Sequence, residues 1–222
     1  MESKAKNKPK AKYTWQRFFM DLGRFVLIFY YMILPMKIYG VDKQKYRKKL
    51  RGGALILANH TSYSDPFYVG RAFAYRRMYF MAADVVLKNR FIGTLLKGMG
   101  CVPINRETYD LKAIKRIIAL AKEGQTVAIF PQGGVHRDNS IQEIKNGAVL
   151  IAVQAGVPLV PMYIHKRRNF FDRPITVVGE SLAIDKKMPS MAEIDAYSEE
   201  MLHRMQKCRE IYDEIVEDRK HA

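Results

Sequence analysis

Short apolar runs alternate with amphipathic stretches through most of the chain. Apolar residues recur three and four apart over 109–122 and 191–217, which is the spacing of helices that bury one face. The apolar runs have the length of strands buried on both faces of a parallel sheet, and they cover 54–58, 78–81, 101–105, 126–130, 157–164 and 174–178. Shorter helices are expected from Pro66, within 84–97 and over 148–155. This alternation predicts an α/β fold with a mainly parallel central sheet flanked by helices.

The first forty residues have a different pattern. Residues 1–12 contain five lysines and no apolar periodicity, which predicts a disordered basic arm. Residues 13–40 are apolar and aromatic, but their uninterrupted apolar run is only about twelve residues long and contains Pro35. A transmembrane helix needs about 20 such residues. We therefore expect a membrane-associating helical segment that dips into the bilayer or lies on it, with an ordinary core helix as the alternative.

Residues 41–222 are expected to form a single domain around one core. The chain of 222 residues has a formal net charge of +16, which implies an anionic partner: nucleic acid, an anionic membrane or a phosphate-bearing substrate. Lysines and arginines lie both before and after the apolar segment, which is typical of cytoplasmic flanks. Cys101 and Cys208 are far apart and form no C-x-x-C pair, so neither zinc nor a disulfide framework is indicated.

A histidine and a carboxylate stand at the end of the apolar run 54–58. His60 begins a polar turn, and Asp65, followed by Pro66, is expected to cap the next helix. Across such a turn, the carboxylate can accept a hydrogen bond from one imidazole nitrogen. The other nitrogen is then free to take a proton from a substrate hydroxyl. The arrangement corresponds to a serine protease triad without its serine.

The run Asn59-His60-Thr-Ser62-Tyr-Ser-Asp65 resembles the H-x4-D signature of the glycerolipid acyltransferases, whose best-known members are 1-acylglycerol-3-phosphate acyltransferases. Further blocks of this family have counterparts in the correct order at 100–106, 130–138 and 157–161, so the resemblance covers roughly 52–165. It implies that His60 is the general base and that Asp65 orients it. Asn59, Ser62 or nearby backbone N–H groups are expected to stabilise the oxyanion.

The resemblance also implies residues that bind the acceptor. Arg106, after the strand 101–105, would bind its phosphate, for which a guanidinium has the matching donor geometry. Lys145 lies in an element resembling the family's Lys-x-Gly-Ala. The third block is commonly Phe-Pro-Glu-Gly-Thr-Arg-Ser. Here Phe130, Pro131 and Gly133 match, whereas Gln132 replaces the glutamate, Gly134 the threonine and Val135 the arginine.

These departures bear on the acceptor. Glutamine keeps one carbonyl acceptor but loses the negative charge, so a structural hydrogen bond would survive and a role that needs an anion would not. Arg137, two positions after Val135, is a candidate for the phosphate contact, and His136 is a second one. The identity of the acceptor therefore stays open.

The resemblance implies a membrane-associated O-acyltransferase in phospholipid biosynthesis. It would transfer a fatty acyl group from acyl-CoA or acyl carrier protein to the free hydroxyl of lysophosphatidic acid. We expect no metal, no cofactor beyond the acyl donor, no nucleic acid partner, and a position on an anionic membrane surface at its cytoplasmic face. One alternative is a different lysophospholipid or other acceptor, and another is a non-catalytic protein that binds anionic membranes or nucleic acid. Binding that falls steeply with salt, and that survives loss of His60 and Asp65, would favour the non-catalytic protein.

Overall fold

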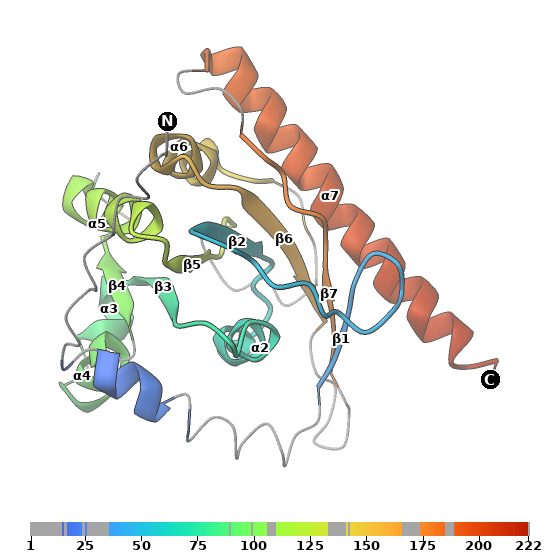
Figure 1. The fold of residues 1–222 in the computed structure, drawn as a ribbon, viewed down its shortest axis with the longest axis horizontal. Coiled ribbons are helices and arrows are strands. Elements are labelled where there is room, and N and C mark those ends of the chain that lie inside the picture. Colours follow the sequence, from blue (N-terminus) through green and yellow to red (C-terminus); the bar gives the residue numbers. More distant parts are fainter. Residues whose placement is uncertain are drawn as a thin grey trace, which may run out of the picture.

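The computed structural model describes residues 15, 17–23, 25, 36–88, 90–98, 100–105, 110–132, 141, 143–165, 174–184 and 189–221. The predicted basic arm, residues 1–12, lies outside them. Within the described residues seven strands form one sheet in the order β1-β7-β6-β2-β5-β3-β4 (Figure 1). The strands are β1 (Lys37–Tyr39), β2 (Ala54–Ala58), β3 (Met78–Ala83), β4 (Cys101–Ile104), β5 (Thr126–Ile129), β6 (Leu159–Ile164) and β7 (Ile175–Val178). Neighbouring strands are parallel except for β6 and β7, so the mainly parallel sheet is confirmed.

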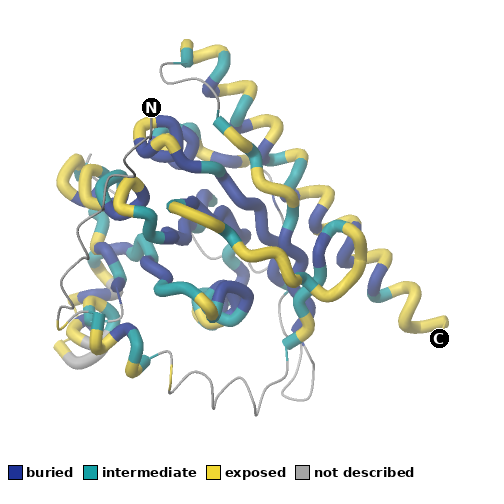
Figure 2. The backbone as a smooth tube through the Cα atoms, viewed as in Figure 1, coloured by how far each residue is buried: buried dark blue, intermediate teal, exposed yellow. Residues whose placement is uncertain are grey.

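Helices cover both faces of this sheet. They are α2 (Asp65–Ala72), α3 (Asp84–Leu87), α4 (Arg90–Gly98), α5 (Leu111–Lys122), α6 (Asn146–Ala155) and α7 (Met191–Asp218). Along β2, Leu55 and Leu57 pack in a core with residues of α5, α6 and α7, whereas Ile56 and Ala58 pack with residues of α2. The sheet thus lies between α5, α6 and α7 on one face and α2 on the other. The exposed segment 45–51 crosses the α2 face (Figure 2).

Helix α7 is the long amphipathic helix that the sequence predicts, and it packs on the sheet. It begins with a capping box, in which the Ser190 hydroxyl accepts from the Glu193 N–H and the Glu193 carboxylate accepts from the Ser190 N–H. Its buried positions recur at helical spacing and pack against β6 and β7; they include Ile194, Met201, Met205, Cys208, Tyr212 and Ile215.

The predicted helical segment ends earlier than residue 40. Lys37–Tyr39 form strand β1, which pairs in parallel with β7, so the expectation of helix is wrong for these residues. The turn after β1 is fixed to the end of α7, because Lys43 forms ion pairs with Glu214 at 3.0 Å and with Asp218 at 3.4 Å. Strand β1, which forms one edge of the sheet, therefore lies before residue 41, where the predicted domain was expected to begin.

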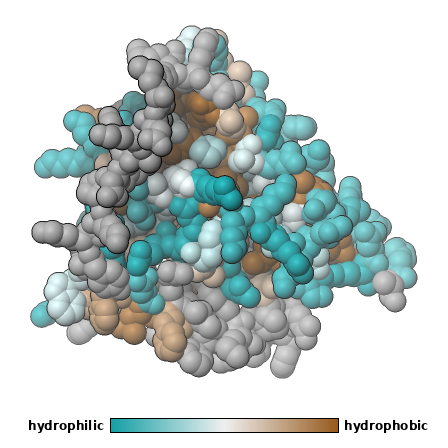
Figure 3. Space-filling model, viewed as in Figure 1, coloured by the Kyte–Doolittle hydropathy of each residue, from teal (hydrophilic) through white to brown (hydrophobic). Residues whose placement is uncertain are grey.

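Residues 15, 17–23 and 25 are helical and lie at the β3–β4 edge of the sheet. Met20 is buried against this edge, and Arg77, the residue before β3, donates two hydrogen bonds to Asp21, at 2.9 and 2.6 Å. The opposite side of this helix exposes large apolar side chains, namely Trp15, Phe18, Phe19, Leu22 and Phe25. Figure 3 shows apolar side chains gathered at the lower left, where Figure 1 places this helix. Within the described ranges, no helix has the length and apolar character needed to cross a membrane.

Candidate active site

The residue after β2 connects two strand ends. Asn59 is fully buried, its carboxamide nitrogen donates to the Ile164 carbonyl at 2.8 Å, and its carboxamide oxygen accepts from the Ile164 N–H at 2.7 Å. The nitrogen and the oxygen of the Asn59 carboxamide thus both bond to Ile164, the last residue of β6. The predicted contact of Asn59 with substrate is therefore corrected: Asn59 bridges β2 and β6 and fixes the point from which the chain continues.

His60 and Asp65 form the hydrogen bond that their spacing predicts. The distance from His60 Nδ1 to Asp65 Oδ2 is 2.9 Å, and Asp65 is fully buried. The same carboxylate oxygen accepts the backbone N–H groups of Thr61 at 2.6 Å and Ser62 at 2.8 Å. Asp65 is the first residue of α2, and Ser64 holds the cap position without a side-chain cap bond. The predicted cap is therefore wrong, because the carboxylate folds back to hold the preceding turn.

Phe130 supports one face of the His60 imidazole ring. The imidazole stacks on the Phe130 ring with a centroid distance of 4.3 Å and an interplanar angle of 20°. With Nδ1 donating to the carboxylate, Nε2 is the nitrogen that carries the free lone pair. Nε2 has no hydrogen-bond partner in the part of the chain that the structure describes, and the side chain is 13% exposed. The ring is thus oriented to accept a proton from a molecule that approaches from solvent.

Gln132, just after β5, fixes the backbone of the same histidine. Its carbonyl oxygen Oε1 accepts the His60 N–H at 3.3 Å. The structural hydrogen bond that glutamine was expected to retain in place of glutamate is therefore present. This bond ties the ends of β2 and β5, just as Asn59 ties the ends of β2 and β6.

The other predicted site residues are placed less centrally. The Ser62 hydroxyl lies 3.0 Å from the Ser64 hydroxyl, within the turn. Lys145 is exposed at the N-cap of α6, and the first turn of a helix that leads into a parallel strand lies at the carboxyl edge of the sheet. Three predicted residues lie outside the described part of the chain: Arg106, Gly133 and Arg137.

Two supports of the site were not found by sequence reasoning. Phe130 matched the third block, but its stacking under the imidazole depends on the register between β2 and β5. Asp110 accepts the N–H groups of Ala113 and Asn105, and these bonds lower the pKa of its carboxyl group. It thereby caps α5 and holds the end of β4, where the chain continues to Arg106. An aspartate just before a helical pattern was the available signal.

Comparison with known proteins identifies the family. A family model described as Acyltransferase matches residues 38–165, which include the whole His60–Asp65 turn and Gln132. The chain belongs to the acyltransferase family. The match to the family and to relatives named as acyltransferases makes it an O-acyltransferase.

Relatives of this acyltransferase support the assignment. It is 29% identical over 170 residues to a 1-acyl-sn-glycerol-3-phosphate acyltransferase of Bacillus subtilis, covering 73% of this chain and 84% of the relative. It is 33% identical over 109 residues to an enzyme of the same name from Streptococcus pneumoniae, covering 49% of this chain and 40% of the relative. The crystal structure of the 1-acyl-sn-glycerophosphate acyltransferase of Thermotoga maritima has a TM-score of 0.60 at 19% identity, covering 89% of this chain and 79% of that one, and it shows a shared fold.

Proposed function

We propose that this acyltransferase transfers a fatty acyl group from a thioester donor to the free hydroxyl of lysophosphatidic acid, giving phosphatidic acid. The observation that supports this most is the His60–Asp65 pair, in which a buried carboxylate holds Nδ1 of an imidazole whose side chain is 13% exposed. The names of the Bacillus subtilis and Streptococcus pneumoniae relatives favour lysophosphatidic acid as the acceptor.

In this mechanism His60 is the general base. The acceptor hydroxyl gives its proton to Nε2 while its oxygen attacks the thioester carbonyl carbon, and the carbonyl becomes a tetrahedral oxyanion. Collapse of this intermediate forms the ester and breaks the carbon–sulfur bond, and the leaving thiolate takes the proton back from His60. Asp65 stabilises the imidazolium in between. Proton transfer by a positioned base contributes about 10²–10⁴ to the rate.

The oxyanion needs hydrogen-bond donors, and several of the expected ones already have partners within the protein. Asn59 is committed to Ile164, and the N–H groups of Thr61 and Ser62 are committed to Asp65. The Ser62 hydroxyl remains a candidate, because in its contact with Ser64 either hydroxyl can be the donor. Arg106 and Lys145 are proposed to hold the acceptor's phosphate on the strength of the family resemblance. Arg137 is proposed because it is the cation next after Val135, which replaces the family's arginine.

Membrane association is part of the proposal. The exposed aromatic side of the N-terminal helix, with Trp15, Phe18 and Phe19, has the composition of a membrane-interface anchor. The net charge of +16 favours an anionic surface, and lysophospholipid acceptors reside in membranes. We place the enzyme on the cytoplasmic face of the membrane. Residues 13–36 would anchor it there, and the sheet domain would lie on the cytoplasmic side of this anchor.

The test is acyl transfer by the purified protein in mixed micelles, with lysophosphatidic acid compared with a panel of other lysolipids. Product with lysophosphatidic acid at a kcat/KM well above the rest is expected. If product forms with another lysolipid alone, that lysolipid replaces lysophosphatidic acid as the acceptor. The departures from the family's third block at Gln132 and Val135 would then be assigned to acceptor specificity. The absence of transfer to every acceptor would overturn the proposed function.

A further inference from the structure

A basic strap, by which we mean residues 45–51, crosses the α2 face of the sheet. Its cations are all exposed: Lys45, Arg47, Lys48, Lys49 and Arg51. None of their side chains has a hydrogen-bond or ion-pair partner among the residues that the structure describes. From residue 44 to residue 77 the one acidic residue in the sequence is Asp65, which is fully buried. The strap therefore presents uncompensated positive charge to solvent.

The backbone of the strap is fixed on the domain. The side chains of Tyr46 and Leu50, which alternate with the cations, pack against the apolar core beneath α2. The Tyr46 N–H donates to the Ile38 carbonyl at 2.9 Å. Near the other end, the Leu50 N–H donates to the Tyr75 hydroxyl at 2.8 Å, and Arg76 donates to the Leu50 carbonyl at 3.0 Å. The strap thus holds its cations on the outside of a rigid support.

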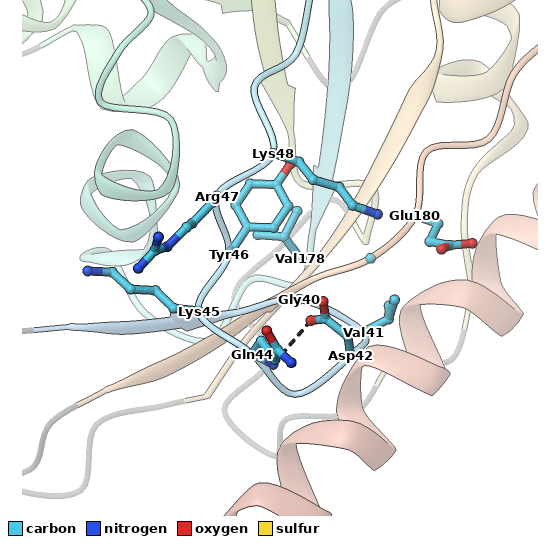
Figure 4. A pocket seen from close by; sticks show the side chains of 11 residues that line it. Gly40, Val41, Asp42, Gln44, Lys45, Tyr46, Arg47, Lys48, Val178 and Glu180 are labelled. Atoms are coloured by element: carbon cyan, nitrogen blue, oxygen red, sulfur yellow. Dashed lines mark hydrogen bonds between the residues drawn. The ribbon is translucent and has the colours of Figure 1, made fainter.

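The cations at the start of the strap are directed away from the nearest carboxylates. Lys45 and Arg47 extend toward the side of α2, whereas Glu180 lies on the opposite side of the pocket that the strap borders (Figure 4). The Asp42 carboxylate, which also lines this pocket, accepts the Gln44 N–H at 3.1 Å. The positive charge of the strap is therefore available on the side of α2.

The strap and the catalytic histidine lie on one face of the sheet. His60 stacks on Phe130, and Phe130 packs against the same apolar core as Tyr46 and Leu50 of the strap. A flat anionic surface that contacts the strap would therefore lie on the face that carries the base.

Exposed aromatic side chains accompany the cations on this face. Tyr63, in the turn between His60 and Asp65, is 79% exposed and forms no hydrogen bond or ring contact with the described residues. Phe67, in the first turn of α2, is 37% exposed. Aromatic side chains beside cations are typical of surfaces that lie at the headgroup level of a bilayer.

The residues before β3 connect the strap to the N-terminal helix. Arg76 holds the Leu50 carbonyl, and the next residue, Arg77, donates two hydrogen bonds to Asp21 of that helix. Adjacent residues thus attach the end of the strap and the helix whose exposed aromatic side is the proposed anchor. This connection favours a bilayer over a nucleic acid as the anionic partner of the strap.

We propose that the strap is a second membrane contact, which binds anionic lipid headgroups and turns the α2 face, with His60, toward the leaflet. The inference rests on the membrane association in the proposed function and adds the orientation of the domain. Clusters of about four to eight Lys or Arg residues beside a membrane bind anionic lipids, and each cation contributes about fivefold in affinity. One apolar anchor holds a protein on a bilayer, whereas a second contact also limits its rotation.

The test compares two variants of the full chain that lose the same charge. The strap variant is Lys45→Gln/Arg47→Gln/Lys49→Gln. The control variant is Lys112→Gln/Lys115→Gln/Arg116→Gln, on the exposed side of α5, which covers the opposite face of the sheet. Sedimentation measures binding to phosphatidylcholine vesicles with and without phosphatidylglycerol. At low salt the strap variant is expected to bind the anionic vesicles about 100-fold more weakly than wild type and the neutral vesicles equally well. The control variant is expected to match wild type.

Vesicle binding needs no turnover, so a loss in the strap variant supports the inference even if no acceptor is acylated. Where transfer occurs, the strap variant is expected to lose at least about tenfold in kcat/KM with lysolipid in anionic vesicles. It is expected to match wild type with a short-chain lysolipid dissolved as monomers. Binding to anionic vesicles within about threefold of wild type would overturn the proposal. So would an equal loss in the control variant, an equal loss with the dissolved lysolipid, or a loss confined to duplex DNA.

Discussion

Asp65 is the residue whose replacement separates the architecture of the site from its chemistry. Its carboxylate accepts two backbone N–H groups, from Thr61 and Ser62, besides the imidazole of His60. Hydrogen bonds to a charged group contribute about 1.5–3 kcal/mol each, so Asp65→Ala is expected to lower the free energy of unfolding by about 3–6 kcal/mol. Asp65→Asn keeps a carbonyl oxygen that can still accept both N–H groups, in neutral hydrogen bonds of about 0.5–1.5 kcal/mol each. The asparagine variant is therefore expected to lose only about 2–3 kcal/mol of unfolding free energy.

Activity is expected to follow a different order from stability. The asparagine variant remains folded, since domains of this kind have about 5–15 kcal/mol of stability, but it lacks the charge that stabilises the imidazolium. Its kcat is expected to fall by about 10²–10⁴. Urea unfolding followed by circular dichroism gives the stability, and thioester consumption gives kcat. An asparagine variant within tenfold of wild type, or an alanine variant as stable as wild type, would refute the reasoning.

Three further predictions concern the surroundings of the site and the core. Gln132→Leu removes the acceptor of the His60 N–H and is expected to lower kcat by up to about tenfold, with Gln132→Glu closer to wild type; equal rates for all three proteins would contradict this. Burial raises the pKa of the Cys101 thiol to about 11 and that of Cys208 to about 12, so iodoacetamide at pH 8 should alkylate both only after unfolding. Because the Cys208 thiol ionises first in the unfolded chain, near the ordinary thiol pKa of 9.0, stability should fall as pH rises from about 9 to about 12, as urea midpoints would show. Gly53→Ala places a Cβ against a carbonyl of α5 and should lower stability by about 1–3 kcal/mol; an unchanged thermal midpoint would be inconsistent with this contact.

Local pattern predicted most elements of the fold because they are regular on the scale of a few residues. The spacing in 191–217 determines which side of α7 is apolar, and the run 54–58 is short and apolar enough to be a central strand. Strand β1 could not be predicted in this way. Lys37–Tyr39 have no distinctive pattern, and their extended conformation comes from pairing with β7, far along the chain.

The site was predictable where its contacts are local. His60 and Asp65 lie within one turn, so spacing and family resemblance were sufficient to pair them. Asn59 was misassigned because its partner, Ile164, lies on a neighbouring strand. Local sequence pattern does not predict which strands are neighbours in the sheet. The acceptor contact of Arg106 stays a prediction from the resemblance, and that of Arg137 stays a prediction from its position after Val135.

The central claim is that His60 is the base of a direct acyl transfer. The most direct measurement is kcat for ester formation by His60→Ala, compared with wild type and with His203→Ala, which removes an exposed histidine on α7. The account predicts a fall of about 10²–10⁴ for His60→Ala, with an unchanged circular dichroism spectrum and no loss for the control. Turnover by His60→Ala within about tenfold of wild type would contradict the account, because a general base contributes more than tenfold to the rate.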